Sequence, residues 1–449
     1  MQIKNICCIG AGYVGGPTMA VIALKCPDIN VTVVDANPER IKAWNGPLNS
    51  LPIYEPGLSD VVKRTRGQNL FFSEDIAENI EKSEMIFMAV NTPTKTEGKG
   101  AGMAADLSYV EACAKDIARY SKSNKIVIEK STVPIRTAEK IKELLDDNNN
   151  SIHFEILSNP EFLAEGTAIS DMKSPDRVLI GGDESESGQK AVQALVDIYA
   201  NWIPKEKILT TNVWSSELAK LASNAMLAQR ISSINSLSAI CEKTGASIDE
   251  LSKAIGMDHR IGPYFLKASV GFGGSCFQKD ILNLVYLYKF YGLEEVAEYW
   301  HQVIKINDYQ KDRFAQKIID YFGGDLTSKK IAILGWAFKS NTNDSRESAA
   351  IKVSEILYNC GASLTIYDPR VQKRTIINDI EQLWTINNSL KDKRINIVEK
   401  FGDIKNCDAF VILTEWEEFK QIDIEDTKVI FDGRNINQNQ NQNKISIGK

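Results

Sequence analysis

A glycine-rich stretch that ends in a cysteine is the part of this sequence best equipped for covalent chemistry. Cys276 ends the run SVGFGGSC, and the following FQKDILNLVYLY has the apolar spacing of a helix. A helix N-terminus stabilises negative charge, so a thiolate is favoured at Cys276 over the other cysteines. Asp280 falls one turn later on the same face, where it could orient a water or an ammonium group. We therefore predict a reactive thiol at Cys276, against the alternative of a small buried apolar side chain.

Two pairs of polar residues have spacing that suits catalysis. Lys220 and Asn224 are one turn apart in a long predicted helix, where a lysine and an amide could stabilise an oxyanion; a solvated helix face is the alternative. In NPEFLAEG, Glu161 and Glu165 are spaced by one helical turn just after a predicted strand, where α/β proteins place ligand sites. On spacing alone, helix capping and surface charge explain this second pair equally well.

The motif GAGYVG follows a predicted strand and opens a predicted helix. Gly10 permits a tight turn, Gly12 lets the backbone approach a pyrophosphate, and Gly15 allows close helix packing. Asp35 ends the next strand, where its carboxylate would accept hydrogen bonds from the adenosine ribose and repel a 2′-phosphate. We predict a dinucleotide site that prefers NAD over NADP, against the alternative of a purely structural turn. Arg40 either lies along the adenosine or is solvated.

The elements that must position these residues form two α/β halves around a helical middle. In the first half, the short runs IKNICCIG, VTVVDA, MIFMAV, IVIEKS and FEILSNP alternate with helical stretches, which predicts a doubly wound parallel sheet. Ser131 and Thr132 end the fourth of these strands. From Asn212 to Gly245 the chain lacks proline and predicts one long helix. A second α/β series follows: KKIAILGWAF, SLTIYDP, DAFVILT and KVIFDGR.

These changes in the predicted secondary structure indicate three domains, at residues 1–211, 212–325 and 326–449, with FGGDLTSKK as the second linker. The first is an α/β dinucleotide domain, the second is helical and the third is again α/β. The terminal NINQNQNQNKISIGK is of low complexity and poor in core-forming residues, so we expect much of it to be mobile.

Composition excludes several classes of protein. With 449 residues, 43% of them hydrophobic and 25% charged, the chain is not disordered and has material for two or three cores. A net charge of −6 without a long basic block argues against nucleic acid or an anionic membrane as the main partner. Three histidines, none at zinc-ligand spacing, argue against a metal site or a Ser-His-Asp hydrolase. Scattered cysteines without a CxxC are typical of a reducing compartment, so we expect a soluble cytoplasmic protein.

The uncharged stretch at residues 6–24 contains four glycines and a proline, so we do not interpret it as a membrane span or signal peptide.

Six segments together resemble one known family: GAGYVGGPT, VNTPT, EKSTVP, SNPEFLAEGTA, SSELAKLASNA and ASVGFGGSCFQKD. They closely resemble the UDP-glucose 6-dehydrogenases of eukaryotic type, within the UDP-glucose/GDP-mannose dehydrogenase family, and the resemblance covers nearly the whole chain. It implies two Rossmann-like domains joined by a long central helix and a helical middle domain. NAD would bind in the first domain and the UDP-sugar across the interdomain cleft, in dimers that assemble into a hexamer.

The same resemblance assigns residues to roles. Catalytic positions are Cys276, Lys220, Asp280, Glu161, Thr132 and Asn224. NAD contacts fall on Gly10, Ala11, Gly12, Tyr13, Val14, Gly15, Asp35, Arg40, Val90, Asn91, Thr92, Pro93, Thr94, Ser131, Glu165 and Arg346. Substrate contacts fall on Glu161, Phe162, Leu163, Ala164, Glu165, Lys220, Asn224, Arg260, Phe265, Lys267, Phe272, Gly273, Phe338, Lys339 and Arg434, with Arg260 serving the neighbouring subunit and no metal involved.

The reaction that the resemblance implies is oxidation of UDP-glucose to UDP-glucuronate with reduction of two NAD⁺. Cys276 would attack the aldehyde left by the first hydride transfer, and the resulting thiohemiacetal would give up the second hydride to form a thioester. Lys220 and Asn224 would stabilise the oxyanion, and Glu161, with Thr132 and Asp280, would activate the hydrolytic water. The alternatives are the same chemistry on another nucleotide sugar, such as UDP-N-acetylmannosamine or GDP-mannose, and an NAD-binding regulatory protein without turnover.

Overall fold

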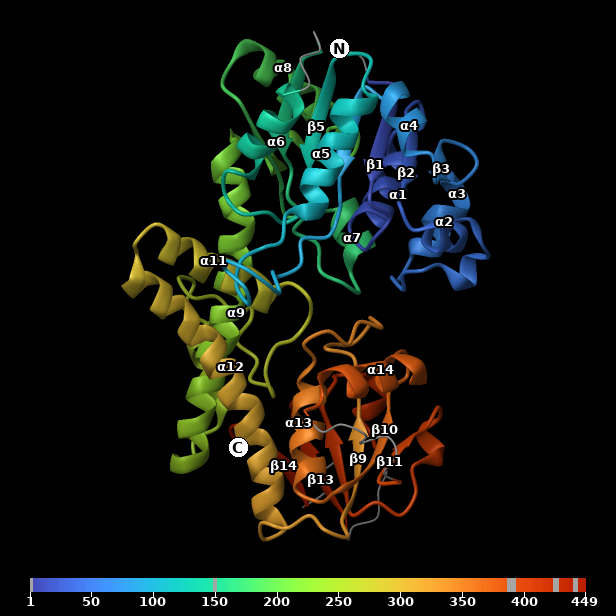
Figure 1. The fold of residues 1–449 in the computed structure, drawn as a ribbon. Helices are drawn as coiled ribbons and strands as arrows, with labels where there is room; N and C mark the ends of the chain where they lie inside the picture. Colours follow the sequence, from blue (N-terminus) through green and yellow to red (C-terminus); the bar gives the residue numbers. More distant parts are fainter. Residues whose placement is uncertain (1–2, 148–151, 386–392, 423–427, 439–442) are drawn as a thin grey trace. The chain divides into compact units, whose positions relative to one another are not determined.

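Two α/β units make up the chain in the computed structural model, which describes residues 3–147, 152–385, 393–422, 428–438 and 443–449. Unit 1 is Met1–Ser223 and unit 2 is Asn224–Lys449. The division falls within helix α9 (Val213–Thr244), the long helix predicted from Asn212 to Gly245 (Figure 1). The partition into three domains at residues 211 and 325 stays a prediction.

Unit 1 is built on an eight-stranded sheet in the order β3-β2-β1-β4-β5-β6-β7-β8. Its strands are β1 (Asn5–Ile9), β2 (Asn30–Val34), β3 (Leu70–Ser73), β4 (Met85–Met88), β5 (Lys125–Glu129), β6 (Phe154–Ser158), β7 (Val178–Gly182) and β8 (Ile208–Asn212). Neighbours pair in parallel except β6 and β7. The strand order reverses between β1 and β4, and the crevice at the carboxyl ends of such a pair is where doubly wound sheets bind ligands.

Helices cover both faces of this sheet, as the nearly continuous apolar strands predict. They are α1 (Gly15–Lys25), α2 (Pro38–Asn45), α3 (Leu58–Thr65), α4 (Ile76–Lys82), α5 (Ser108–Tyr120), α6 (Thr137–Asp146), α7 (Ala168–Lys173) and α8 (Glu186–Tyr199), with short 3₁₀ turns η1 (Leu48–Ser50) and η2 (Lys205–Lys207). Alternate residues of β1 enter the two layers: Ile6 and Cys8 pack with α1, α3, α7 and α8, whereas Cys7 and Ile9 pack with α4, α5 and α6. The doubly wound α/β prediction for this half is confirmed.

The uncharged stretch at residues 6–24 forms most of β1 and α1. No helix in the described part of the chain is long and apolar enough to cross a membrane.

Unit 2 begins with helices and ends with a second parallel sheet. After α9 come α10 (Ile248–Gly256), α11 (Phe277–Phe290) and α12 (Glu294–Tyr321). The sheet order is β11-β10-β9-β12-β13-β14, from β9 (Lys330–Leu334), β10 (Ser363–Tyr367), β11 (Ile395–Ile397), β12 (Ala409–Ile412), β13 (Val429–Asp432) and β14 (Lys444–Ser446). The remaining elements are α13 (Ala349–Asn359), α14 (Lys373–Leu383), η4 (Phe401–Asp403) and η5 (Glu417–Phe419). The crossover order is that of the first six strands of unit 1, so unit 2 has a second Rossmann-like sheet.

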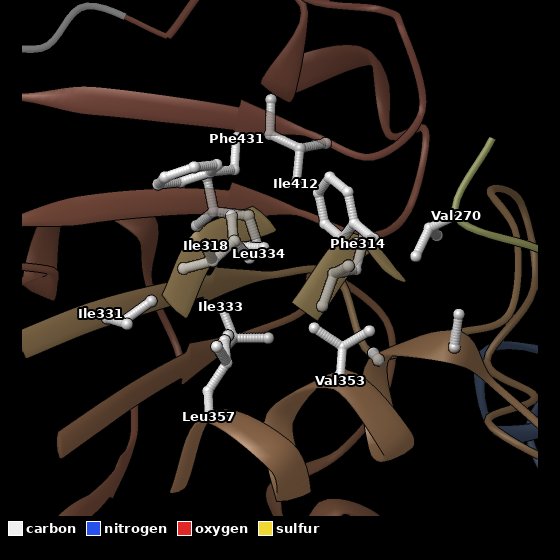
Figure 2. Packing of buried hydrophobic residues seen from close by; sticks show 14 of the residues in the cluster. Val270, Phe314, Ile318, Ile331, Ile333, Leu334, Val353, Leu357, Ile412 and Phe431 are labelled. Atoms are coloured by element: carbon white, nitrogen blue, oxygen red, sulfur yellow. The ribbon is translucent and has the colours of Figure 1, made fainter. Parts of the chain in front are cut away.

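The core of unit 2 joins its long helix to its sheet. Phe314 and Ile318 of α12 are fully buried among side chains of β9, β12 and β13, with Val353 and Leu357 of α13 nearby (Figure 2). Because close packing fixes α12 against the sheet, residues carried by α12 hold defined positions relative to the ends of its strands.

The expectation of a largely mobile tail is wrong for its last residues. Lys444–Ser446 form β14, which pairs in parallel with β13, and Ile447 is buried in the unit 2 core. The Gly448 N–H donates to a carboxylate oxygen of Glu242 at 2.8 Å, and the Gly448 carbonyl accepts from the Ile248 N–H at 2.9 Å. Residues 439–442 of the low-complexity stretch lie outside the described residues. Two apolar residues, Ile445 and Ile447, are enough to anchor the tail because the β13 edge offers a row of hydrogen-bonding partners.

We predict that Ile447→Ala destabilises unit 2. Removing a buried isoleucine costs about 2–5 kcal/mol, so calorimetry should show a lower melting temperature for the transition of unit 2. Gln438→Ala, an exposed position before the same strand, serves as the matched control and should melt as the wild type does. A melting curve for Ile447→Ala that superimposes on the wild-type curve would show that the tail contributes nothing to the fold.

Candidate active site

The turn between β1 and α1 contains three glycines of two kinds. Gly10 and Gly15 have no room for a side chain, whereas Gly12 borders open space. Gly10 has φ +112°, and a Cβ there would lie 2.4 Å from the carbonyl oxygen of Ala89. A Cβ on Gly15 would lie 1.9 Å from the carbonyl oxygen of Gly10. At Gly12, no atom of the described residues comes within 4 Å of that position. The backbone at Gly12 therefore borders open space at the N-terminal end of α1, where helix dipoles favour a phosphate group.

Asp35 lies beside this turn and is almost fully buried. Its carboxylate accepts hydrogen bonds from the Ala11 N–H at 2.8 Å and the Asn37 N–H at 2.9 Å, and it forms an ion pair with Arg40 at 3.1 Å. A carboxylate has about four lone-pair positions, so these three donors leave room for a ribose hydroxyl. The open backbone at Gly12 and the acid at the end of β2 fit the two ends of an adenosine diphosphate.

The loops that follow β4 and β5 are bonded to each other. The Ser131 hydroxyl donates to the carbonyl of Val90 at 2.6 Å, and the Thr92 hydroxyl donates to the carbonyl of Thr132 at 2.7 Å. Residues predicted to contact the cofactor, 90–94 and 131, therefore form one structure with Thr132, which is predicted to act in catalysis. The hydrogen bonds of the Ser131 hydroxyl and the Thr132 carbonyl are compatible with the roles predicted for these two residues, which stay predictions.

Glu161 is held differently from the sequence prediction, which placed Glu161 and Glu165 one turn apart on a helix. Residues 159–164 form a loop, and the next helix, α7, begins only at Ala168, so helical spacing is the wrong interpretation. One Glu161 oxygen accepts from the N–H groups of Phe162 at 2.9 Å and Leu163 at 3.1 Å. The loop bends back because the side chain closes hydrogen bonds with the backbone just after it.

Lys130 was not predicted as a site residue, and its ammonium lies 2.9 Å from the second Glu161 oxygen. Lys130 also donates to Asn159 at 3.2 Å, and the Tyr199 hydroxyl donates to the same Asn159 oxygen at 2.7 Å. Burial alone would raise the pKa of Glu161, but Lys130, Lys220 and the Phe162 N–H together hold it below the ordinary value. Glu161 is therefore an ionised carboxylate whose side chain is 17% exposed. The available signal was the lysine directly after the strand IVIE, at the same sheet edge as NPEF.

Lys220 is buried on α9 and joins this group. Its ammonium lies 5.5 Å from the centre of the Phe162 ring, whereas Arg177 lies 3.9 Å from the same ring. Cations over an aromatic face are stabilised by its quadrupole. Unit 1 thus brings together Lys220, Phe162 and Glu161, three residues that the sequence analysis assigned to catalysis or substrate binding.

Cys276 in unit 2 is exposed and caps the N-terminus of α11, as the sequence predicts. The Asp280 N–H donates to the Cys276 carbonyl at 2.9 Å, which places the two residues one turn apart. In contrast, burial raises the pKa of the Cys7 thiol to about 12 and that of Cys26 to about 11. Those buried thiols remain protonated and inert, so the chemistry available to cysteine belongs to Cys276.

Asp280 is fully buried below this N-terminus and has two partners. Asn224 of α9 donates to one carboxylate oxygen at 2.6 Å, and Lys279 lies 3.0 Å from the other. The predicted catalytic residues Asn224 and Asp280 are therefore in direct contact.

The loop before Cys276 is fixed from both sides. The buried Asn307 side chain on α12 accepts from the Phe272 N–H at 2.8 Å and donates to the Phe272 carbonyl at 3.0 Å. Gly274 has φ +86°, and its N–H donates to the carbonyl of Arg346 at 2.8 Å. A Cβ on Gly273 would lie 2.4 Å from the carbonyl oxygen of Glu347. The run SVGFGGSC is thus a rigid turn rather than a flexible linker.

Arg434 donates to backbone carbonyls and forms an ion pair with Glu415 at 3.4 Å. Its guanidinium donates to Leu413 at 2.7 Å, to Phe338 at 2.9 Å and to Gly271 at 3.3 Å. The side chain therefore ties the glycine loop to the ends of β9 and β12, and its predicted substrate contact stays a prediction. Lys339 is half-buried, with its ammonium 5.5 Å from the Phe338 ring.

Three predicted substrate residues lie in an exposed loop after α10. Arg260 forms an ion pair with Asp258 at 2.6 Å rather than with another predicted site residue. Phe265, with φ +60°, and Lys267 are exposed. Their assignments stay predictions.

Three family models match the chain. They are the NAD binding domain, the central domain and the UDP binding domain of the UDP-glucose/GDP-mannose dehydrogenase family, at residues 4–203, 214–309 and 332–439. The chain is 57% identical to UDP-glucose 6-dehydrogenase of Mus musculus, over 97% of this chain and 90% of the relative. It is 56% identical to UDP-glucose 6-dehydrogenase 1 of Glycine max, over 96% and 93%.

Solved structures agree over the full length. A UDP-glucose dehydrogenase from Pyrobaculum islandicum matches with a TM-score of 0.86 and 30% identity, over 99% of this chain and 97% of that one. A UDP-D-ManNAc dehydrogenase from Pyrococcus horikoshii matches with a TM-score of 0.80 and 25% identity, over 99% of both chains.

We predict that Lys130→Met raises the pH at which activity is lost on acidification. Without the ammonium, burial dominates and the pKa of Glu161 rises, because the largest charge that favours its ionised form is gone. The stabilisation that ionised Glu161 contributes is present above its ordinary pKa and disappears as pH falls, so the variant should also melt at a lower temperature. The pH–rate profile and melting curves measure both effects.

Two controls accompany this variant. Lys190→Met, which removes the exposed partner of Glu186, should change neither measurement. Lys130→Met/Glu161→Gln removes the unpaired charge and should recover melting temperature without recovering activity. If Lys130→Met folds and keeps the wild-type acidic limb, Lys130 does not set the ionisation of Glu161.

Proposed function

This chain belongs to the UDP-glucose/GDP-mannose dehydrogenase family, and from that premise we propose that it oxidises UDP-glucose to UDP-glucuronate with reduction of two NAD⁺. Members of this family are NAD-dependent oxidoreductases. The observation that carries the choice of substrate is the identity of 57% over nearly the whole length to a UDP-glucose 6-dehydrogenase. The solved relatives act on different sugars, so fold similarity alone does not choose between them.

The turn between β1 and α1 fits the proposed cofactor. Gly12 leaves open space for a pyrophosphate, and Asp35 has an acceptor position for a ribose hydroxyl that a 2′-phosphate would repel. The residues proposed to hold NAD are the turn 10–15, Asp35, Arg40, residues 90–94, Ser131, Glu165 and Arg346. Bound NAD⁺ supplies the hydride acceptor.

Cys276 is proposed as the nucleophile. Its thiolate adds to the C6 aldehyde of the sugar, and the carbonyl oxygen takes up a proton to become the hydroxyl of a thiohemiacetal. Loss of the C6 hydride to NAD⁺ and of the hydroxyl proton to solvent then gives a thioester. Water then attacks the thioester carbon, the C–S bond breaks, and the carboxylate product leaves with Cys276 restored. Exposure of Cys276 at the N-terminus of α11 supports this role, because the helix dipole favours negative charge on sulfur.

The other proposed catalytic residues either stabilise negative charge on the substrate or accept a proton from water. Lys220 and Asn224 are proposed to stabilise the oxygen anion that develops at C6, with Asn224 oriented by its 2.6 Å bond to Asp280. Glu161 is proposed to take a proton from the attacking water, directly or through a water held by Thr132 and Asp280. Its ion pair with Lys130 supports this role, since a base must be ionised before it can accept a proton.

Substrate binding is proposed to use three groups of residues. One is the segment 162–165, the second is Arg260 with 265–273, and the third is Phe338, Lys339 and Arg434 in the UDP binding domain. Lys339 offers a cation to the diphosphate in a chain of net charge −6. The alternatives are another nucleotide sugar and an NAD-binding protein without turnover; an assay with several sugars separates them.

A homodimer, assembled further into a hexamer, is the proposed quaternary structure. Large apolar side chains are exposed on the helices of unit 2, among them Met226 and Ile240 of α9, Phe290 of α11 and Tyr299 of α12. These exposed apolar side chains support a protein–protein interface. We place the reaction in the cytoplasm, because the exposed Cys276 can act as a nucleophile only while it stays reduced.

We predict two NADH per UDP-glucose and no free aldehyde. Absorbance of NADH after limiting UDP-glucose measures the ratio, with GDP-mannose and UDP-N-acetylmannosamine as comparison substrates. One NADH per sugar, or release of the aldehyde, would contradict covalent retention. If another nucleotide sugar is oxidised in preference to UDP-glucose, the proposed substrate is wrong but the proposed reaction mechanism still holds.

Cys276→Ser should lose turnover by on the order of 10³-fold or more, the scale found for loss of a nucleophile. Its oxygen ester hydrolyses slowly, so a sugar adduct should appear in the intact mass. Cys360→Ser, at a partly exposed cysteine of unit 2, is the matched control and should turn over normally. Normal turnover in Cys276→Ala would remove Cys276 from the mechanism.

A final prediction concerns Arg260 as a residue shared between subunits. A mixed dimer of Cys276→Ala and Arg260→Ala subunits would contain one site with both groups intact, so co-expression should restore up to one working site per mixed dimer. Mass spectrometry confirms that mixed dimers are present. Activity no higher than that of the two parents would show that Arg260 does not act across the interface.

A further inference from the structure

Two buried glutamates face each other beneath the loop that carries Ser131 and Thr132. Glu129 is the last residue of β5 and Glu217 lies in the second turn of α9, and each is only 2% exposed. The two carboxyl groups are within hydrogen-bonding reach of each other. Neither Glu129 oxygen has a donor among the described residues. As a carboxylate, Glu129 would be a buried charge next to a second one, which is a costly arrangement.

Glu217 is the member of the pair that has donors. One of its oxygens accepts from the Arg136 N–H at 2.6 Å and the other accepts from the Ala138 N–H at 2.8 Å. Arg136 is the residue before α6 and has φ +74°, a conformation that a non-glycine residue adopts only when its surroundings hold it. A negative charge at a helix N-terminus is stabilised by the dipole and by its unsatisfied N–H groups. Glu217 is therefore the carboxylate, and Glu129 is the carboxylic acid.

The pair closes both ends of the loop at residues 130–136. Glu129 precedes this loop, the Arg136 N–H ends it, and both meet the single side chain of Glu217. The loop contains Lys130, which pairs with Glu161, and Thr132. Glu217 also lies three residues before Lys220 on α9, one helical turn away. One side chain thus connects the loop, α6 and the helix that carries a predicted catalytic lysine.

We propose that Glu129 and Glu217 share one proton, and that this acid–carboxylate pair is a positioning device that fixes the 130–136 loop against α9. The role rests on the proposed function, because it matters only if Thr132, Glu161 and Lys220 serve the same reaction. Neither glutamate touches the substrate in this proposal.

The surroundings contain few other charges that could replace this interaction. On β5 and its neighbours, Glu129 is paired in register with Met88 of β4 and Ser158 of β6. The Arg136 guanidinium donates to Glu139 at 2.6 Å and lies over the Trp214 ring, and Lys130 pairs with Glu161. At the start of α6, the N–H groups that meet Glu217 of α9 are those of Arg136, Thr137 and Ala138.

Burial and mutual repulsion raise the pKa of Glu129, and burial raises that of Glu217. At a pH below the ordinary glutamate pKa, folded and unfolded chains both hold the proton, and the pair costs nothing. Above it, the unfolded chain releases the proton and the folded protein keeps it, so stability falls as pH rises. Once the shared proton is lost, two adjacent negative charges repel and the loop loses its fixed position.

Glu129→Gln is the decisive variant, because its amide N–H can donate to Glu217 as the acid does but cannot ionise. Infrared spectra at neutral pH should show the carbonyl band of a protonated carboxylic acid in the wild type and not in Glu129→Gln. The difference in melting temperature, Glu129→Gln minus wild type, should grow from about pH 6 to about pH 9. Glu143→Gln, an exposed change on the same α6, should show neither effect.

Activity separates positioning from stability alone. Glu129→Gln should keep kcat at neutral pH, whereas Glu129→Leu, which has no donor, should lose kcat by about 10- to 100-fold with a smaller change in KM. Glu217→Gln replaces one of the two oxygens that accept from the Arg136 and Ala138 N–H groups. It should therefore lose kcat as Glu129→Leu does.

A missing acid band, or a Glu129→Gln melting curve with wild-type pH dependence, would overturn the shared proton. A wild-type kcat in folded Glu129→Leu would overturn the positioning role. Failure of the proposed function has a different signature: the band and the melting behaviour would be as expected, and no variant, nor the wild type, would reduce NAD⁺ with UDP-glucose.

Discussion

Lys130 and Glu161 form a largely buried ion pair, and the loops of unit 1 supply further hydrogen bonds to both partners. Moving an ion out of water costs several kcal/mol even after the protein relaxes, so each partner needs further hydrogen bonds. Lys130 donates one to the side-chain oxygen of Asn159, and Glu161 accepts two from the N–H groups directly after it. These partners lie at the carboxyl ends of β5 and β6. The charge requirement therefore fixes two loops that the sheet alone would leave to vary.

The cost of burying a charge also separates reactive side chains from structural ones. Most cysteines are buried among apolar side chains, where desolvation keeps them protonated. Cys276 alone is exposed in the described part of the chain, and it begins a helix. Arg434 shows the opposite case: a residue of a type suited to phosphate binding is used to satisfy backbone carbonyls. The type of a side chain limits its chemistry, but its partners decide which part of that chemistry is available.

Much of the fold could be predicted because its signals are local. The glycine turn, Asp35 at the end of β2 and the long helix α9 each depend on residues within one or two elements. Spacing failed for Glu161, because a loop that closes on its own backbone has no periodicity to detect. Lys130 and Glu217 were missed, since their partners lie 31 and 81 residues away in sequence and meet them only through strand and helix packing. For Lys130, the one available signal was its position directly after the strand IVIE. The tail was misjudged for the same reason: Lys444–Ser446 gains its order from β13 and not from its own composition.

The position of β14 at the edge of the second sheet also has a consequence for the order in which the protein is made. The sheet of unit 1 is complete once Asn212 has been synthesised, whereas β14 begins at Lys444, which is 444 − 212 = 232 residues later. At about 5–20 residues per second, a ribosome needs roughly 12–46 s to cover that distance. During this interval unit 1 can fold and expose its glycine turn to cofactor, whereas the first strand of the second sheet begins only at Lys330 and β13 only at Val429. A nascent chain would therefore be competent to bind a nucleotide in one half while the sheet of the other half is still incomplete.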